Sequence, residues 1–368
     1  MLRFLAMAFR SRTSLPGAAA LLLALHLPAL NPSGVSAAPA PASEATPSPP
    51  AESQADTSGE KPEYLPPDTA KAGTRDSPEP PPLPPRIGWK SDLLAPLLGL
   101  FVPGVPQYFQ GRPLLGLAYT GTALAGLSLS SQGEKEYKKK WGTKPEFNPL
   151  TESPEERKYI VGGLLFQGAE FLSLYQAFRS SVPAYQREDG MYRFLPPPDK
   201  GIDLALAPVH FGFLARPTSY IPLGLLASVV TYLVADERDS HAGADWTFSG
   251  DDLLFGGALA YNAGVSEEAA FRGWLLPLAY QYTGQRWFLA NGLQAGLFAA
   301  AHYSEDVRYP VVQALLGYYF GYLIRRNGWS LSESIFQHFW WDAILFTGGF
   351  LTQRRVPAAI QISLPLPL

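Results

Sequence analysis

The chain has 368 residues, a net charge of −3 and no cysteine. The lack of cysteine excludes disulfides, thiolate metal sites and a cysteine nucleophile, and the near-neutral charge without a basic stripe gives no sign of nucleic-acid binding. The mean hydropathy of −0.02 averages two unlike parts, a Pro- and charge-rich N-terminal segment and an apolar body.

Residues 1–38 are predicted to be a secretory signal peptide. A basic start precedes the short apolar run 17–30, and small residues suitable for cleavage follow at 36–38. The basic residues are Arg3, Arg10 and Arg12. The run is short for a spanning helix, and Pro28 interrupts it, but an uncleaved N-terminal anchor is the alternative.

Residues 39–90 are predicted to be a disordered linker. The segment consists largely of Pro, Ala, Ser, Glu and Thr and has almost no large apolar side chains. Such a composition buries too little surface to offset the chain entropy that folding removes.

Residues 91–235 are predicted to hold the N-terminal membrane helices and their polar loops. Segment 93–129 is either a helical hairpin or a re-entrant piece followed by one spanning helix, because prolines and polar residues break it. The charged segment 132–158 is predicted to be a solvated loop, and by the positive-inside rule it should be cytoplasmic. Further apolar segments are predicted at 159–178, 204–214 and 221–235.

Four apolar segments with short connections follow within residues 250–350, namely 251–282, 287–303, 307–324 and 329–350, before the tail 351–368. A spanning segment must satisfy its backbone internally, and no alternating barrel pattern occurs. The predicted fold is therefore all-α, a polytopic transmembrane bundle of about six to eight helices. Two glycine pairs four residues apart predict close helix packing, Gly292/Gly296 and Gly317/Gly321.

Glu267, Glu268 and Arg272 interrupt the first of these four segments. Ionisable side chains at membrane depth usually face a bundle interior or a water-filled cavity and indicate a functional site. Glu268 and Arg272 are four residues apart, so they share a helix face and can pair. Glu267 is rotated by about 100° from Glu268 and is predicted to be free of this pair.

Two further polar sets lie on the later helices. His302 ends the motif Phe-x-x-x-His, and His338 and Asp342 are four residues apart on the last helix. Asp342 is predicted to orient the imidazole of His338 and to stabilise its protonated form. If the four helices alternate in direction, Glu267, His302 and His338 fall at a similar membrane depth.

These residues favour activation of water against a carbonyl, by one of two routes. Glu267, His302 and His338 are a common ligand set for a catalytic zinc ion. Without metal, Glu267 serves as the general base with His302 holding the water, and His338 stabilises the oxyanion. Both routes predict amide or ester hydrolysis.

The three motifs together resemble the CPBP family, the CAAX-prenyl endopeptidase and bacteriocin-processing membrane proteins also called the Abi family. They are Glu-Glu-x-x-x-Arg (267–272), Phe-x-x-x-His (298–302) and His-x-x-x-Asp (338–342), in this order. The resemblance covers about residues 250–350 and implies an intramembrane endopeptidase. The last motif position is often Asn in the family, and an Asp there must be protonated to donate to an oxyanion, or must act through His338.

The leading hypothesis is thus a membrane-embedded peptidase in a bacterial cell membrane, acting on a peptide or a membrane-anchored protein. Two alternatives use the same polar residues without hydrolysis. One is a non-catalytic immunity or scaffold protein, and the other is a small-solute carrier, against which the lack of an inverted repeat counts.

Overall fold

A computed structural model describes residues 93–352 apart from 146, 241–247 and 303–309. The predicted signal or anchor, the Pro-rich linker and nearly all of the tail lie outside the described residues. Within the described part of the chain the secondary structure is entirely helical, as expected from the apolar segments.

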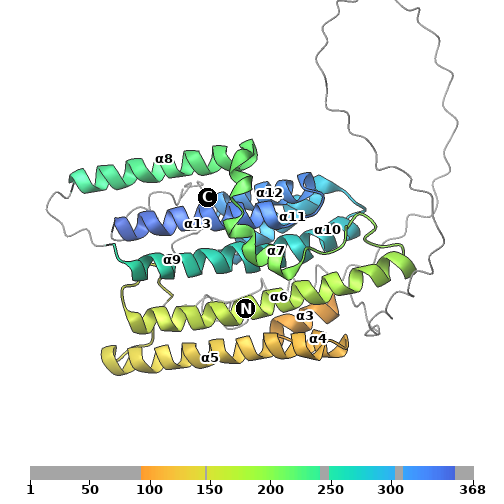
Figure 1. The fold of residues 1–368 in the computed structure, drawn as a ribbon, viewed down its shortest axis with the longest axis horizontal. Coiled ribbons are helices and arrows are strands. Elements are labelled where there is room, and N and C mark those ends of the chain that lie inside the picture. The colour runs from red at the N-terminus through yellow and green to blue at the C-terminus, as the bar shows by residue number, and fades with distance from the viewer. Residues whose placement is uncertain (1–92, 146, 241–247, 303–309, 353–368) are drawn as a thin grey trace, which may run out of the picture. The chain divides into compact units, whose positions relative to one another are not determined.

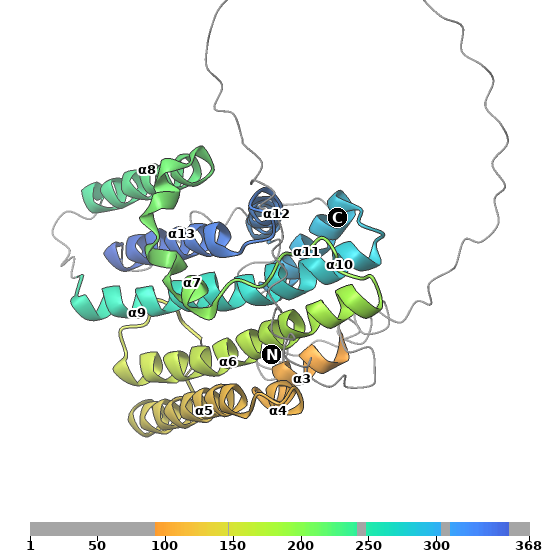
Figure 2. The same ribbon diagram turned by 45° about the vertical axis from the view of Figure 1, so that its right-hand side comes forward.

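Five long helical stretches lie side by side in a layer (Figures 1 and 2). In order across the layer they are α5 (Pro113–Trp141), α6 (Pro154–Glu188), α9 (Gly250–Asn262) with its continuation, α13 (Ser332–Leu351) and α8 (Pro217–Ser240). Two further helices, α11 (Trp287–Ala301) and α12 (Val311–Arg326), pack against each other, and α12 also contacts α13. Between α6 and α8 the chain forms α7 (Gly201–Leu206) and the 3₁₀ turns η1 (Ala207–Val209) and η2 (Phe211–Ala215).

The predicted segment 251–282 is one continuous helix from residue 250 to 282. It consists of α9, two π-helical segments, η3 (Ala263–Glu267) and η4 (Ala269–Leu275), and α10 (Leu276–Tyr282). The helix begins with a capping box, in which the Ser249 and Asp252 side chains bind each other's backbone N–H groups. π-Helical turns are rare and occur frequently at functional sites.

The region 93–129 is not a hairpin of two long helices. Two short helices, α3 (Leu94–Phe101) and α4 (Val105–Phe109), precede the long helix α5. Polar groups fasten this N-terminal piece to α6, because the Gly104 N–H donates to Ser173 Oγ at 3.0 Å and Gln107 Nε2 donates to the Ser173 carbonyl at 2.8 Å. Gly104 has φ +93°, a left-handed conformation that a residue with a Cβ rarely adopts.

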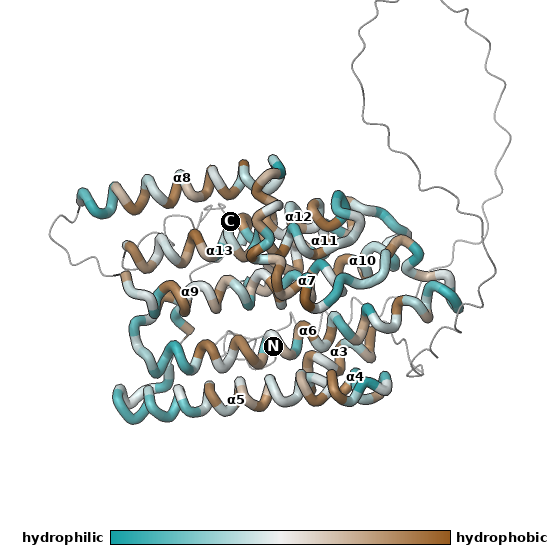
Figure 3. The backbone as a smooth tube through the Cα atoms, viewed as in Figure 1, coloured by the Kyte–Doolittle hydropathy of each residue, from teal (hydrophilic) through white to brown (hydrophobic). Residues whose placement is uncertain are grey.

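The prediction that 132–158 is a solvated loop was wrong over most of its length. Helix α5 continues to Trp141 and α6 begins at Pro154, so the connection is confined to 142–153. Ion pairs extend the two helices beyond their apolar parts, with Lys140 Nζ 3.1 Å from Glu155 Oε1 and Lys158 Nζ 2.6 Å from Glu136 Oε2. Figure 3 shows this end of α5 and α6 as hydrophilic.

The prediction of close helix packing holds for one of the two glycine pairs and not for the other. A Cβ added to Gly317 would lie 3.1 Å from Phe298, and one added to Gly321 would collide with Asn291, so α12 approaches α11 closely at both positions. At Gly292 and Gly296, however, no described heavy atom lies within 4 Å of an added Cβ. The packing prediction was therefore wrong for the pair on α11.

Two helices of the described part of the chain are long and apolar enough to cross a membrane, α5 and residues Pro217–Asp239 of α8. Both are mostly exposed within the structure, and Figure 3 shows α8 as largely hydrophobic. Helices α11 and α12 are shorter, with 15 and 16 residues, and α6 alternates apolar and polar side chains. Two apolar helices agree with a membrane protein. They do not establish the predicted number of about six to eight membrane helices.

Close backbone contact between α5 and α6 generates the first prediction. A Cβ at Gly162 would lie 2.6 Å from the Gly126 carbonyl oxygen, whereas one at Gly121 would meet nothing within 4 Å. We expect Gly162→Leu to destabilise the protein by about 1–3 kcal/mol through overpacking. Thermal unfolding in detergent measures this loss, with Gly121→Leu on α5 as the control. Equal unfolding temperatures for both variants would show that the two helices do not pack as described.

Candidate functional site

The continuous helix 250–282 carries two consecutive glutamates, of which Glu267 is the last residue of η3 and Glu268 lies between η3 and η4. Gly264 lies where this helix contacts α13. A Cβ added to Gly264 would lie 3.0 Å from both the backbone nitrogen and the Cβ of Phe339. Glu268 is fully buried, whereas the side chain of Glu267 is 16% exposed. The two carboxylates therefore point into different surroundings.

Glu268 is the centre of a buried polar cluster. Its Oε1 lies 2.9 Å from Nη1 of Arg272 and 2.8 Å from Nδ1 of His338, and its Oε2 accepts a hydrogen bond of 2.6 Å from the Ser334 hydroxyl. All three partners are buried. A carboxylate with this many partners is compensated within an apolar site, as a buried charge must be.

The positive charge of Arg272 is stabilised by the faces of aromatic rings as well as by Glu268. Its guanidinium carbon lies 4.1 Å from the ring centroid of Phe298 on α11 and 5.3 Å from that of Phe320 on α12. The Arg272 N–H groups form no hydrogen bond to a described residue despite the short distance to Glu268. The attraction to Glu268 is thus electrostatic without an aligned hydrogen bond, and cation–π contact supplies the remaining stabilisation.

His302 and Glu267 face each other in a more accessible place. The distance between His302 Nε2 and Glu267 Oε2 is 3.7 Å, and the side chains are 32% and 16% exposed. His302 Nδ1 lies 2.8 Å from the Phe298 carbonyl oxygen, and since a carbonyl only accepts, Nδ1 carries the proton. In the neutral imidazole Nε2 is then an acceptor directed towards Glu267, whose Oε2 has no hydrogen-bond partner among the described residues.

The side chain that makes the hydrogen bond to His338 is not the one predicted from the sequence. Glu268 binds its Nδ1, and Phe320 stacks on its ring with centroids 4.9 Å apart. Asp342 lies on the other side, with Oδ2 3.6 Å from Nε2, which is longer than a hydrogen bond. Glu268, and not Asp342, makes the orienting hydrogen bond to this imidazole.

The six predicted residues thus form two adjoining groups, Glu267 with His302, and Glu268 with its partners. Phe298 lies between them, since its ring centroid is 4.5 Å from that of His302 and 5.9 Å from that of His338. Sequence reasoning missed Ser334, although its spacing of four residues from His338 puts both on one face of α13. It also missed the aromatic residues around Arg272.

The zinc alternative requires three donor side chains that converge on one point. Within the described ranges, no three His, Asp or Glu side chains are grouped so that they could hold a metal ion. His338 binds Glu268 through Nδ1, so Nε2 is the nitrogen left for a metal ion, but Nε2 is not grouped with Glu267 and His302 as a set of three ligands. As described, the residues do not form a zinc centre.

The described part of the chain is a helical protein with a buried carboxylate–histidine centre next to a partly exposed Glu–His pair. Residues 249–344 match the family model described as type II CAAX prenyl endopeptidase Rce1-like. The match covers about a quarter of the chain and confirms the resemblance of its motifs to the CPBP family. The family consists of membrane-integral proteases, so at this level the chain is related to peptide hydrolases. Neither the curated proteins nor the solved structures contain a match to the chain.

The buried ion pair generates the second prediction. Arg272→Met removes the charge that compensates Glu268, and breaking a buried pair costs about 3–5 kcal/mol. The free energy of unfolding in detergent measures this loss. The control is Glu268→Gln combined with Arg272→Met, which leaves no uncompensated charge and should recover part of the stability. A double variant no more stable than Arg272→Met alone would contradict the pairing.

Proposed function

We propose that the protein is a membrane-embedded endopeptidase that hydrolyses a peptide bond with a water molecule activated by Glu267 and His302. The observation that carries this proposal is the unpaired Oε2 of Glu267 facing His302 Nε2 across 3.7 Å. The Rce1-like domain at 249–344 supports the reaction class. The substrate is a peptide or a membrane-anchored protein, and the setting is a polytopic bundle in a bacterial cell membrane.

Glu267 and neutral His302 present two acceptors to the same space. A water molecule placed there donates one hydrogen to each, which directs its oxygen lone pair outward. As that oxygen attacks the scissile carbonyl carbon, its proton passes to Glu267, which then protonates the leaving amine. His302 is held for this role by its Nδ1–H bond to the Phe298 carbonyl.

His338 is the group proposed to stabilise the oxyanion. Its Nδ1 donates to Glu268, so Nε2 donates to a substrate oxygen only in the imidazolium form. Glu268 and Asp342 flank the ring and both carry charge of the sign that favours this form. Asp342 then acts on His338 through its charge and not through an orienting hydrogen bond, which accommodates an Asp at a place where the family often has Asn.

The third prediction tests the base. Glu267→Gln keeps the size of the side chain but removes the acceptor of the proton, and His302→Ala removes the second water contact. We expect each variant to lose about 10²- to 10⁴-fold in kcat. Cleavage of a membrane-peptide library by purified protein measures this loss, and Glu152→Gln, at an exposed position in the α5–α6 connection, is the matched control.

Two outcomes would overturn the proposal. A wild-type protein that cleaves nothing would favour the non-catalytic immunity or scaffold alternative. Equal cleavage by wild type and Glu267→Gln would place the base elsewhere.

The fourth prediction concerns metal. We expect cleavage to persist after chelator treatment and elemental analysis to find no stoichiometric zinc, because the donor arrangement does not suit a catalytic zinc ion. Zinc bound in a one-to-one ratio, and lost in both His302→Ala and His338→Ala, would instead establish the metal route.

A further inference from the structure

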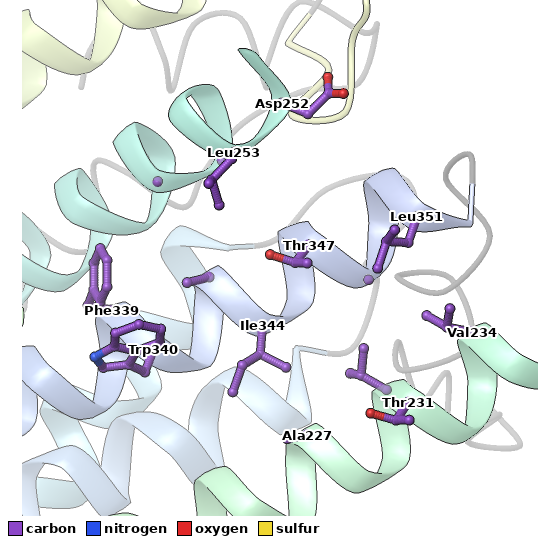
Figure 4. Close-up of a pocket in the computed structure, with 15 residues that line it drawn as sticks. Ala227, Thr231, Val234, Asp252, Leu253, Phe339, Trp340, Ile344, Thr347 and Leu351 are labelled. Atoms are coloured by element: carbon purple, nitrogen blue, oxygen red, sulfur yellow. The ribbon is translucent and has the colours of Figure 1, made fainter. Parts of the chain in front are cut away.

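An apolar groove lies beside the candidate site, between α8, α9 and α13. Its volume is about 400 Å³, and its walls are formed by small and aliphatic side chains of these three helices (Figure 4). Asp252 and Leu351 lie at one end, and Phe339 and Trp340 lie at the other. Besides Asp252, the polar side chains of the lining are the hydroxyls of Thr231 and Thr347.

Small residues keep the groove open. Gly257 on α9 lines it, and no described heavy atom lies within 4 Å of a Cβ added there. Ala227 on α8 and Ala343 on α13 form parts of the other walls. Gly256 also lines the groove, and a Cβ added there would lie 3.3 Å from Phe346 and Phe350, so Gly257 is the more open of the two positions.

The dimensions fit one hydrocarbon chain. Residues 340–351 of α13 extend over about 16 Å at about 1.5 Å per residue. That is about half of a hydrocarbon core roughly 30 Å thick, which is the depth of one lipid leaflet.

The charged residues near the end of the groove where Asp252 lies determine which lipid headgroup can bind there. Helix α8 ends with Asp236, Glu237, Arg238 and Asp239, and α9 begins with Asp251 and Asp252, at the same end of the layer (Figures 1 and 2). Arg157 forms an ion pair with Asp252. Among the described residues at these ends of α8 and α9, together with Arg157, five carboxylates face two guanidinium groups, which disfavours an anionic headgroup and favours one that ends in an ammonium group.

We propose that this groove holds one acyl chain of a zwitterionic phospholipid with an ammonium headgroup, such as phosphatidylethanolamine. The headgroup lies near Asp252, and the chain runs along α13 to Phe339 and Trp340. The proposal rests on the membrane setting of the proposed function but not on its hydrolytic chemistry. A bound lipid therefore forms one wall of the protein between α8 and α9.

The experiment uses the full chain in phosphatidylcholine nanodiscs that contain a phosphatidylethanolamine probe with a photoreactive diazirine in its acyl chain. Mass spectrometry of the irradiated protein should find the label on α13 between Phe339 and Leu351. Gly257→Leu fills the groove and should lower this labelling about tenfold, equivalent to ~1.4 kcal/mol of binding free energy. Gly292→Leu, also an open helical position but on α11, is the matched control and should label like wild type.

Three results would overturn the proposal. The first is equal labelling of α13 in wild type, Gly257→Leu and a second blocking variant, Ala227→Leu, which also covers the case that one variant fails to fold. The second is equal labelling by a phosphatidylglycerol probe, which would exclude selection of an ammonium headgroup. The third is labelling by a diazirine-bearing lipid anchor on a peptide but not by the phospholipid, which would make the groove a substrate site. Labelling needs no peptide cleavage, so it is independent of whether the protein is a protease.

Discussion

The buried charge of Glu268 is the constraint on which the C-terminal helices depend. Its carboxylate reaches His338 and Ser334 on α13, and its partner Arg272 contacts Phe298 on α11 and Phe320 on α12. An uncompensated charge in an apolar interior is so unfavourable that these groups must meet. One ion pair on the helix 250–282 thereby sets the positions of three other helices, each from a different part of the sequence.

The two adjacent glutamates, Glu267 and Glu268, have different surroundings and therefore different roles. Both oxygens of Glu268 have partners, since Oε1 lies beside Arg272 and accepts from His338 and Oε2 accepts from Ser334, so it is a structural and electrostatic group. Glu267, one residue earlier, keeps an oxygen without a hydrogen-bond partner among the described residues and faces His302. Glu267 ends one π-helical segment and Glu268 directly precedes the other, so the helix departs from regular α-helical hydrogen bonding at this point.

Local sequence relations were predictable, and non-local ones were not. The four C-terminal helices follow from runs of apolar residues, and the pairing of Glu268 with Arg272 follows from their spacing on one helix. The hydrogen bond from His338 to Glu268 joins residues 70 positions apart, and no periodicity encodes it. Hydropathy also failed at 132–141, because interhelical ion pairs continue α5 where the chain becomes charged. Glycine spacing alone did not distinguish Gly321, which meets Asn291, from Gly292, which meets no described residue.

Helix α13 joins the polar site to the apolar groove. His338 points to Glu268, while the next residue, Phe339, lines the inner end of the groove and packs against Gly264, three residues before Glu267. A Cβ at Gly264 would come within 3.0 Å of Phe339, so the two helices have little freedom to separate or slide there. Phe339 thus lines the groove and, through its backbone nitrogen and Cβ, also contacts the helix that carries both glutamates.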